Sequence, residues 1–306
     1  MMRFYGCDAH KNYSFFTWVD ESGLSGPFFQ VKNERSEFRD YLSTLPSGSL
    51  IALETVGNWY WMVEEMEKAG HLPFWTNAAK AKAMMGKINK TDKLEARGLA
   101  PLLRNGSLPS VWIPPGELRD KRELSRTRMA LVQMRTMIKN RVQAILSKYA
   151  LHMDEISDVF GLKARHILEN RAQELPPYTR ECLFKELELL GEIEQRVQLI
   201  EAVIKSIMIE TEEIKLLQTI PGVGFILAVV IATEIGDIKR FSGPEKLASY
   251  AGTVPRVKAS GGKVFYGPIR PDVNRYLKWA FVEAANTVVI FHKKWPNKHA
   301  ARLTSD

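Results

Sequence analysis

Two stretches of the chain have the apolar spacing of long α-helices, and they restrict its fold more than any other feature. Between Glu117 and about Tyr149, no Pro or Gly interrupts a helical spacing of apolar residues. A second long helix is predicted from Thr179 to Leu217, with apolar residues spaced four, three, three, four, three, four and three positions apart. This heptad seam, which has one irregular step, comprises Leu183, Leu187, Leu190, Ile193, Val197, Ile200, Ile204 and Ile207.

Two arrangements bury such a seam. The two helices form a hairpin within one chain, or the seam forms a coiled-coil arm that pairs with a second copy. We expect an arm that also dimerises, because so long an acidic seam has little else in the chain to cover it. Residues 111–218 are therefore assigned to a helical coiled-coil dimerisation region.

The N-terminal part has the element order of a mixed α/β domain. Strands are predicted at Arg3–Ala9, Ser14–Asp20 and Pro27–Lys32, and consecutive strands of this kind form an antiparallel meander. A helix, a strand, a second helix and a last strand follow at Glu37–Leu45, Ser49–Glu54, Trp59–Lys68 and Leu72–Trp75. This is the order of the ribonuclease H architecture, a mixed sheet flanked by helices, which is one candidate among several α/β folds.

Four carboxylates are candidate metal ligands. Asp8 lies near the end of the first strand and Glu54 closes the fourth, so neighbouring strands would bring both acids to one sheet edge. Asp92 and Glu95 lie three residues apart in a helical segment predicted over Ala78–Arg104, and they share one helix face. Such a cage suits two hard divalent cations, Mg²⁺ or alternatively Mn²⁺, and favours phosphoryl transfer. The alternative is a helix cap, an ion pair with a neighbouring Lys and two polar strand ends.

Two further motifs lie in the C-terminal part. Gly222 and Gly224, in a Pro-Gly-Val-Gly sequence between helices, would let backbone N–H groups approach a phosphate. The alternative is a tight interhelical turn. Ser260 lies between Lys258 and Lys263, where cations would hold a phosphate in front of its hydroxyl for attack. The alternative there is a basic turn whose serine only donates a hydrogen bond.

The net charge of +8 conceals an uneven distribution. Residues 76–150 carry +11 and residues 219–306 carry +7, whereas residues 1–75 carry −4 and residues 151–218 carry −6. Two basic segments separated by an acidic one indicate two surfaces that meet a polyanion, because clustered Lys and Arg release counterions from phosphates. A solvated basic face is the alternative.

The sequence predicts neither a membrane-spanning protein nor a secreted one. The longest uninterrupted apolar run, Phe225 to Ala232, is far shorter than the ~18 residues that a membrane-spanning helix needs. The N-terminal sequence has no basic region followed by an apolar stretch and a cleavage site. Cys7 and Cys182 lie far apart without metal-ligand spacing, which favours a cytoplasmic protein with reduced thiols.

Taken together and in this order, the motifs resemble those of one family. The sequence Gly-Cys-Asp-Ala-His-Lys, the strand ending in Glu54 and the Lys-Thr-Asp-x-x-Glu-Ala element are similar to the RuvC-like domain of the DEDD transposases of bacterial insertion sequences, the insertion-sequence one-hundred-and-ten family. The sequences Ile-Pro-Gly-Val-Gly, Ile-Gly-Asp and Ser-Gly-Gly-Lys are similar to its C-terminal transposase domain.

The resemblance implies a DNA recombinase that acts through Mg²⁺-dependent phosphoryl transfer and a phosphoserine intermediate. It implies Asp8, Glu54, Asp92 and Glu95 as metal ligands and Ser260 as the nucleophile. It also implies a structured bridge RNA that pairs with donor and target DNA, and a dimer of dimers whose active sites combine domains of two protomers. The expected nucleic-acid-binding residues are Lys90, Lys93, Arg97, Gly222, Gly224, Arg256, Lys258 and Lys263.

The expected organisation is α/β plus α, in three parts. Residues 1–110 form a RuvC-like catalytic domain with a ribonuclease H fold, residues 111–218 the arm, and residues 219–306 a mostly helical transposase domain with a helix-hairpin-helix-like motif and the serine. We expect an active-site acid one methylene longer than usual at Glu95, and a different local backbone at Pro271 and Val273, where the family often has Lys and Gly. The rival functions are a junction nuclease that uses the acids alone and an inactive nucleic-acid-binding relic.

Overall fold

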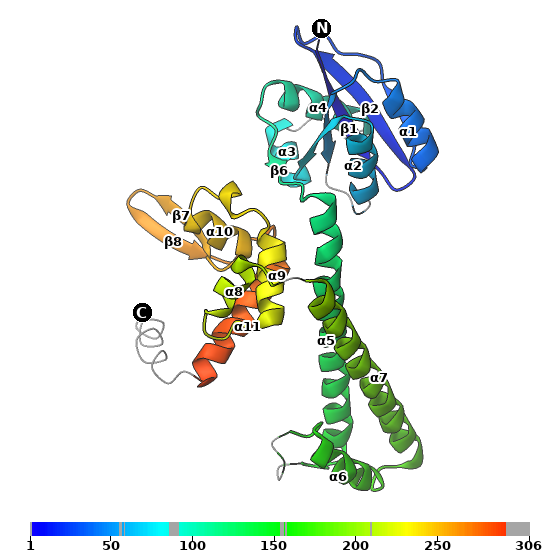
Figure 1. Cartoon of the computed structure of the whole chain (residues 1–306), viewed down its shortest axis with the longest axis vertical. Coiled ribbons are helices and arrows are strands. Elements are labelled where there is room, and N and C mark those ends of the chain that lie inside the picture. Colours follow the sequence, from blue (N-terminus) through cyan, green and yellow to red (C-terminus); the bar gives the residue numbers. More distant parts are fainter. Residues whose placement is uncertain are drawn as a thin grey trace. The chain divides into compact units, whose positions relative to one another are not determined.

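The computed structural model describes residues 2–54, 57, 59–85, 92–153, 156, 158–208 and 210–291, and Figure 1 shows the course of the chain. The chain divides into two compact units, Met1–Gly116 and Glu117–Asp306. Each unit has hydrophobic cores of its own. None of the described helices combines the length and the apolarity that crossing a membrane requires.

A six-stranded mixed sheet forms the centre of the first unit, in the order β3-β2-β1-β4-β5-β6. Its strands are β1 (Arg3–Ala9), β2 (Tyr13–Asp20), β3 (Phe29–Lys32), β4 (Leu50–Glu54), β5 (Leu72–Thr76) and β6 (Ser110–Val111). The first three form the predicted antiparallel meander, β4 and β5 continue parallel to β1, and β6 pairs antiparallel with β5. The prediction of a mixed α/β domain is confirmed.

Helices cover both faces of this sheet. They are α1 (Arg35–Ser43), α2 (Trp59–Lys68), α3 (Ala78–Met85) and α4 (Asp92–Arg104). Because side chains alternate along a strand, Ile51 and Leu53 of β4 enter the core with α1 and α2, whereas Ala52 enters the core with α4. Burial on both faces explains why an unbroken apolar run precedes Glu54. The predicted helical segment Ala78–Arg104 comprises α3 and α4, and residues 86–91 lie outside the described residues.

The second unit begins with a long helical hairpin, which Figure 1 shows in green. Its helices are α5 (Gly116–Lys148), α6 (Leu162–Ala172) and α7 (Pro177–Ile207). The pairing of α5 with α7 is antiparallel, because Arg128 lies 2.6 Å from Glu201 while Arg141 hydrogen bonds to Glu186. The predicted helix from Glu117 to about Tyr149 is confirmed as α5.

Most of the heptad seam of α7 is covered within the same chain, whereas Ile207 at its end is 51% exposed. Seam residues Leu183, Leu190, Ile193 and Val197 are buried in one core with the α5 residues Ile138, Val142 and Leu146. The premise that little else in the chain covers the seam is therefore wrong, and the intramolecular hairpin is the arrangement that buries these four residues. Pairing with a second copy stays a prediction.

The predicted helix Thr179–Leu217 is wrong in one respect, because it is not continuous. Helix α7 ends at Ile207, and α8 (Glu212–Gln218) begins after Thr211. The Thr211 hydroxyl accepts a hydrogen bond from the Ile214 N–H, which caps a new helix, and two acids in its first turn favour a helix N-terminus.

Up to residue 291, the second unit continues with three α-helices, a short 3-10 helix at Ile238–Arg240 and a β-hairpin. The α-helices and strands are α9 (Phe225–Ile235), α10 (Pro244–Ala251), β7 (Arg256–Ser260), β8 (Lys263–Gly267) and α11 (Arg275–Phe291). Apolar residues of α8 to α11 form one core with Ile204 of α7. The mostly helical C-terminal part is thus as predicted, with the β7–β8 hairpin as its sheet element.

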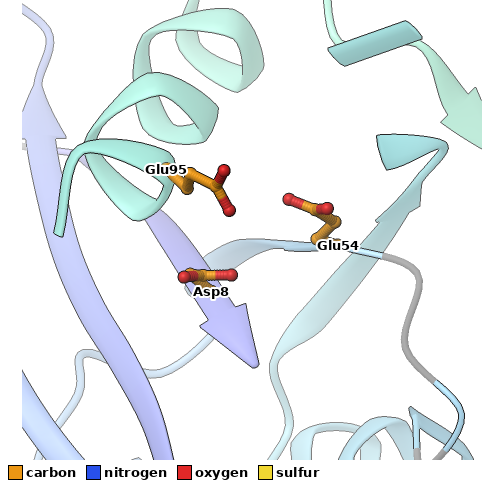
Figure 2. A group of neighbouring side chains, drawn as sticks. All are labelled: Asp8, Glu54 and Glu95. Atoms are coloured by element: carbon orange, nitrogen blue, oxygen red, sulfur yellow. The ribbon is translucent and has the colours of Figure 1, made fainter. Parts of the chain in front are cut away.

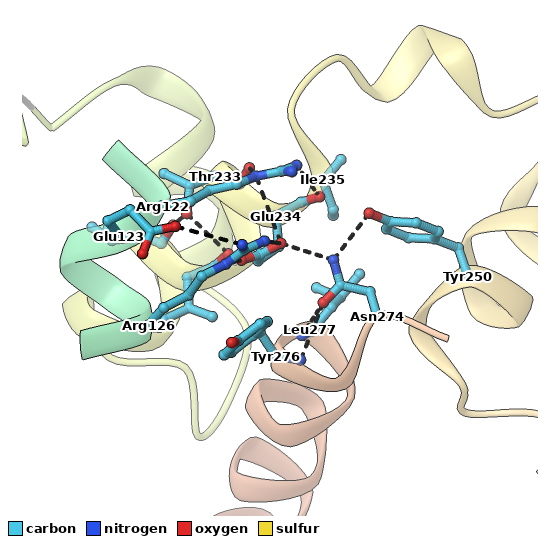
Figure 3. A network of polar contacts seen from close by, with 12 residues as sticks. Arg122, Glu123, Arg126, Thr233, Glu234, Ile235, Tyr250, Asn274, Tyr276 and Leu277 are labelled. Carbon is cyan, nitrogen blue, oxygen red and sulfur yellow. Dashed lines mark hydrogen bonds and ion pairs between the residues drawn. The ribbon is translucent and has the colours of Figure 1, made fainter. Parts of the chain in front are cut away.

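A buried polar network joins α5 to α9 and α11 (Figure 3). The fully buried Glu234 carboxylate accepts hydrogen bonds from Arg126 at 2.8 and 3.1 Å and from Asn274 at 2.8 Å. Arg122 donates to the backbone carbonyls of Thr233 and Glu234, the last turn of α9. Asn274 in turn accepts from the first N–H groups of α11, so one carboxylate fixes the start of α11 relative to α5.

Candidate active site

Three carboxylates meet at one edge of the sheet in the first unit (Figure 2). Strands β1 and β4 are parallel neighbours with Cys7 opposite Leu53, so the next residue of each strand, Asp8 and Glu54, emerges at the same edge. Glu95 reaches them from α4, and one oxygen of each acid lies within 4.8 Å of the other two. The expected meeting of strand acids with a helix acid is confirmed for these three.

A close contact between helix and strand brings Glu95 to this position. Gly6 of β1 is buried, and a Cβ atom there would collide with the backbone carbonyl of Ala96, the residue after Glu95. Only glycine lets the α4 backbone approach the strand so closely. The side chain of Asp92, the fourth predicted ligand, lies outside what the structure describes.

The cluster is electrostatically unfavourable without a cation. The pKa of Asp8 is raised to about 6, mainly because the carboxyl is buried; His10 lowers this pKa, whereas the nearby charges of Glu95 and Glu54 add to the rise. The His10 ring nitrogen Nε2 lies 3.0 Å from Asp8 Oδ2. Lys82 of α3 places its Nζ 3.3 Å from Oε1 of both Glu54 and Glu95. The ammonium group is thus shared by two of the three acids.

The donor set fits a divalent metal ion. All three groups offer carboxylate oxygens, which are the ligands of hard cations. Moreover, the buried Oε2 of Glu54 has no hydrogen-bond partner among the described residues, and a buried acceptor of this kind ordinarily has one. An ion bound by Asp8, Glu54 and Glu95 would satisfy that oxygen.

Sequence reasoning missed His10 and Lys82 as members of this site. His10 carried a signal, because it lies two residues after Asp8, just beyond the end of β1, where its ring can reach the Asp8 carboxylate. Lys82 carried none, since only the placement of α3 on the sheet brings it between two acids that are distant in the sequence.

Ser260 lies in the second unit, at the tip of the β7–β8 hairpin. It ends β7 and pairs with Lys263, the first residue of β8. The two connecting glycines, Gly261 and Gly262, have φ values of 57° and 77°, as a two-residue turn with both φ values positive requires. Ser260, Lys258, Lys263 and Arg256 are all exposed. The serine hydroxyl and three cations are therefore accessible on one hairpin.

The two glycines of the Pro-Gly-Val-Gly motif differ in their surroundings. Gly222 has φ +81°, and a Cβ there would meet the Ala284 carbonyl of α11, so this glycine serves a tight packed turn. Gly224 precedes α9, and no heavy atom lies within 4 Å of a Cβ built on it. Only Gly224 is open to a ligand.

The remaining expectations concern α4 and the loop after the hairpin. Arg97 is exposed on α4, whereas Lys90 lies outside the described residues and the side chain of Lys93 is not described. Among the described non-glycine residues, positive φ is confined to Ala150, so Val273 needs no left-handed backbone. Its side chain instead fills the space above Gly252, where a Cβ would meet it at 2.7 Å.

Comparison with known proteins gives matches in both units. Residues 5–151 match a family model described as transposase, the DEDD type of IS110, and residues 214–301 match one described as Transposase IS116/IS110/IS902 family. The first segment contains the three clustered acids, and the second contains Ser260.

Three relatives carry transposase names. The chain is 28% identical over 224 residues to the transposase for insertion sequence element IS1111A of Coxiella burnetii, which covers 71% of this chain and 60% of that protein. It is 27% identical over 280 residues to the transposase for insertion sequence element IS1328 of Yersinia enterocolitica, covering 92% and 82%. It is 25% identical over 260 residues to a probable family 20 transposase of Pseudomonas aeruginosa, covering 84% and 75%. With both family models matched in order, the chain belongs to the IS116/IS110/IS902 family of transposases.

Proposed function

We propose that this transposase cuts and rejoins DNA of its own insertion sequence in the bacterial cytoplasm, with Asp8, Glu54, Asp92 and Glu95 as ligands of Mg²⁺ and Ser260 as the covalent nucleophile. The observation that carries the proposal is the carboxylate cluster with its unpartnered Glu54 oxygen. The family membership supports divalent-metal chemistry at these acids. Two ions are expected, and Mn²⁺ is an acceptable substitute.

The acids of the first unit and the two cationic residues beside them have different tasks. Asp8, Glu54 and Glu95 would hold the ions, which when bound stabilise negative charge on the oxygens of a reacting phosphodiester. His10 orients the Asp8 carboxylate through its contact at 3.0 Å. Lys82 compensates part of the negative charge of Glu54 and Glu95 when no metal ion is bound. Glu95, one methylene longer than the usual Asp, reaches the cluster because α4 approaches the strand at Gly6.

Ser260 acts by transient covalent attachment to DNA. Its Oγ forms a bond to phosphorus while one bond from phosphorus to a sugar oxygen breaks; the serine proton leaves to solvent and the sugar oxygen takes up a proton. A DNA hydroxyl later attacks the same phosphorus and releases the serine, so strands are rejoined without an external energy source. Exposure of Ser260 beside Lys263 supports this role.

We also propose a guide RNA and an assembly of several copies. A structured bridge RNA would pair with donor and target DNA, so that base pairing carries the sequence information. The two basic segments, residues 76–150 and 219–306, support contacts with two polyanions. On α7, the exposed residues Leu199, Val203 and Ile207 recur every four positions, which supports pairing of this face with a second copy. The functional parts are residues 1–110, 111–218 and 219–306.

The deciding experiment is detection of a covalent protein–DNA adduct. The protein is incubated with element-end DNA, its flanking RNA and Mg²⁺, and the attached residue is mapped by mass spectrometry. We expect the adduct on Ser260, its loss in Ser260→Ala and in Asp8→Ala, and its persistence in Ser206→Ala, which removes an exposed hydroxyl of α7. Cleavage that survives in Ser260→Ala would instead identify a nuclease that uses the acids alone.

A further inference from the structure

The β7–β8 hairpin separates its side chains onto two faces. Lys258 pairs with Phe265, and Val257 pairs with Tyr266. Directly paired residues of an antiparallel ladder point to the same face, and successive residues alternate between faces. One face, here called the serine face, therefore carries Arg256, Lys258, Ser260, Lys263 and Phe265. The opposite face carries Val257, Ala259, Val264 and Tyr266.

The serine face combines cations with one exposed aromatic ring. Phe265 is 60% exposed, and its cross-strand neighbour Lys258 is also exposed. No acidic residue occurs between positions 246 and 271, so the positive charge of this face has no local compensation in the sequence. An exposed phenyl ring among uncompensated cations has the composition of a surface that binds phosphates and stacks bases.

We infer that Phe265 stacks on an unpaired base of the DNA strand that Ser260 attacks. Two residues along a strand span about 7 Å, which places the ring within about two nucleotides of the serine, at 3.4 Å per stacked nucleotide. In a duplex the neighbouring bases occupy both faces of each base, so an aromatic side chain stacks only where the strand is unpaired. This inference rests on the proposed role of Ser260, and it makes the substrate a locally opened duplex.

Charge and position both favour a DNA strand as the molecule that binds to the serine face. Arg256, Lys258 and Lys263 share the face with Phe265, which suits a phosphate backbone. The nucleophile lies on that face too, so the strand bound there is the strand that reacts. Tyr266 is 74% exposed on the opposite face, where Val257, Ala259 and Val264 bring no positive charge, and it provides a matched control.

The inference is tested by measuring the affinity of the protein for two DNA molecules at one fixed salt concentration. One is a single-stranded oligothymidylate of about 20 nucleotides, and the other is a duplex of the same length. For the single strand, fluorescence anisotropy should show affinity about tenfold weaker in Phe265→Ala, near the unmodified value in Phe265→Trp, and unchanged in Tyr266→Ala. Duplex affinity should change less than about twofold in all three. Equal losses for single strand and duplex, or equal effects of the two alanine variants, would overturn it.

Photo-cross-linking locates the ring directly. With 5-iodouracil in the same oligonucleotide, peptide mapping should find the cross-link on Phe265, and a cross-link on Tyr266 alone contradicts the inference. Thermal melting by circular dichroism verifies that each variant is folded. The outcome is separable from that of the proposed function, because Ser260→Ala should retain oligonucleotide binding and lose only the covalent adduct.

Discussion

At the scale of single residues, Lys82 has the most informative position in the first unit. Its ammonium group lies 3.3 Å from one oxygen of Glu54 and 3.3 Å from one oxygen of Glu95, although the side chain is 40% exposed. A cation in that place compensates a cluster of acids that otherwise repel one another. A divalent ion that binds the same oxygens must therefore displace the ammonium group or share the acids with it.

Replacing this lysine should consequently strengthen metal binding. We expect Lys82→Met to bind Mg²⁺ or Mn²⁺ about tenfold more tightly, because the ion no longer competes with an internal cation. The metal-free variant should melt at a lower temperature than the unmodified protein, and excess Mg²⁺ should remove that difference. Calorimetric titration measures the first effect and thermal melting the second.

Lys80→Met is the matched control for this substitution. Lys80 lies on the same helix and is exposed. It should leave the metal affinity unchanged, because neither Glu54 nor Glu95 pairs with Lys80 among the described ion pairs. A Lys82→Met protein that binds the ion more weakly would show that Lys82 assists the metal site instead of competing with it.

At the scale of elements, the close approach of α4 to β1 determines whether Glu95 reaches the other acids. Gly6→Ala introduces a Cβ that collides with the Ala96 carbonyl and lies 3.1 Å from the Ala100 nitrogen. We expect a loss of about 2 kcal/mol in the free energy of unfolding, and weaker divalent-ion binding because Glu95 moves away. Urea denaturation and metal titration measure these effects.

Gly191→Ala on α7 is the corresponding change without a collision. Gly191 is exposed, and no heavy atom lies within 4 Å of its Cβ position. Alanine should therefore stabilise the helix by up to about 1 kcal/mol. If Gly6→Ala stabilises the protein as Gly191→Ala does, the close approach of α4 to β1 does not require a glycine at position 6.

The network around Glu234 is the second element-scale feature. Glu234→Gln keeps the shape but removes the charge that faces Arg126 and Arg122, two arginines that are largely buried. We expect a loss of about 3 kcal/mol in stability of the second unit, because the two arginines lose the buried carboxylate charge that faces them. Glu188→Gln, an exposed acid that pairs with Lys185, should leave the denaturation midpoint unchanged.

Sequence patterns predicted the elements better than their junctions. Asp8 and Glu54 were expected together, because strand order alone places both at one sheet edge. The break before Thr211 was not expected, since the apolar spacing continues across it and only the cap reveals a new helix. For the α7 seam, a hairpin within one chain was one of the two arrangements considered, and an arm that also dimerises was preferred, because heptad spacing does not say whether the covering helix belongs to the same chain.

At the scale of the whole molecule, the candidate groups are divided between the two units. Asp8, Glu54 and Glu95 belong to Met1–Gly116, and Ser260 belongs to Glu117–Asp306. Each unit has its own cores, so each candidate site is built by its own unit. The net charge of +8 belongs mainly to the unit with Ser260, because Met1–Gly116 carries +1 and Glu117–Asp306 carries +7.

Because the acids and the serine belong to different units, an experiment can test whether one active site takes them from a single copy of the chain or from two copies. If a site combines the acids of one copy with the serine of another, co-expressed Asp8→Ala and Ser260→Ala chains form mixed dimers with one complete site. Random pairing makes about half of the dimers mixed, so covalent adduct formation should recover to about a quarter of the unmodified level. Sites built within single copies give no recovery. The control is co-expression of the Asp8→Ala chain with an Asp8→Ala, Ser260→Ala double variant. Neither chain then has a complete set of acids, so no active site can form in either arrangement. If the recovered signal comes from complementation, this control gives no adduct.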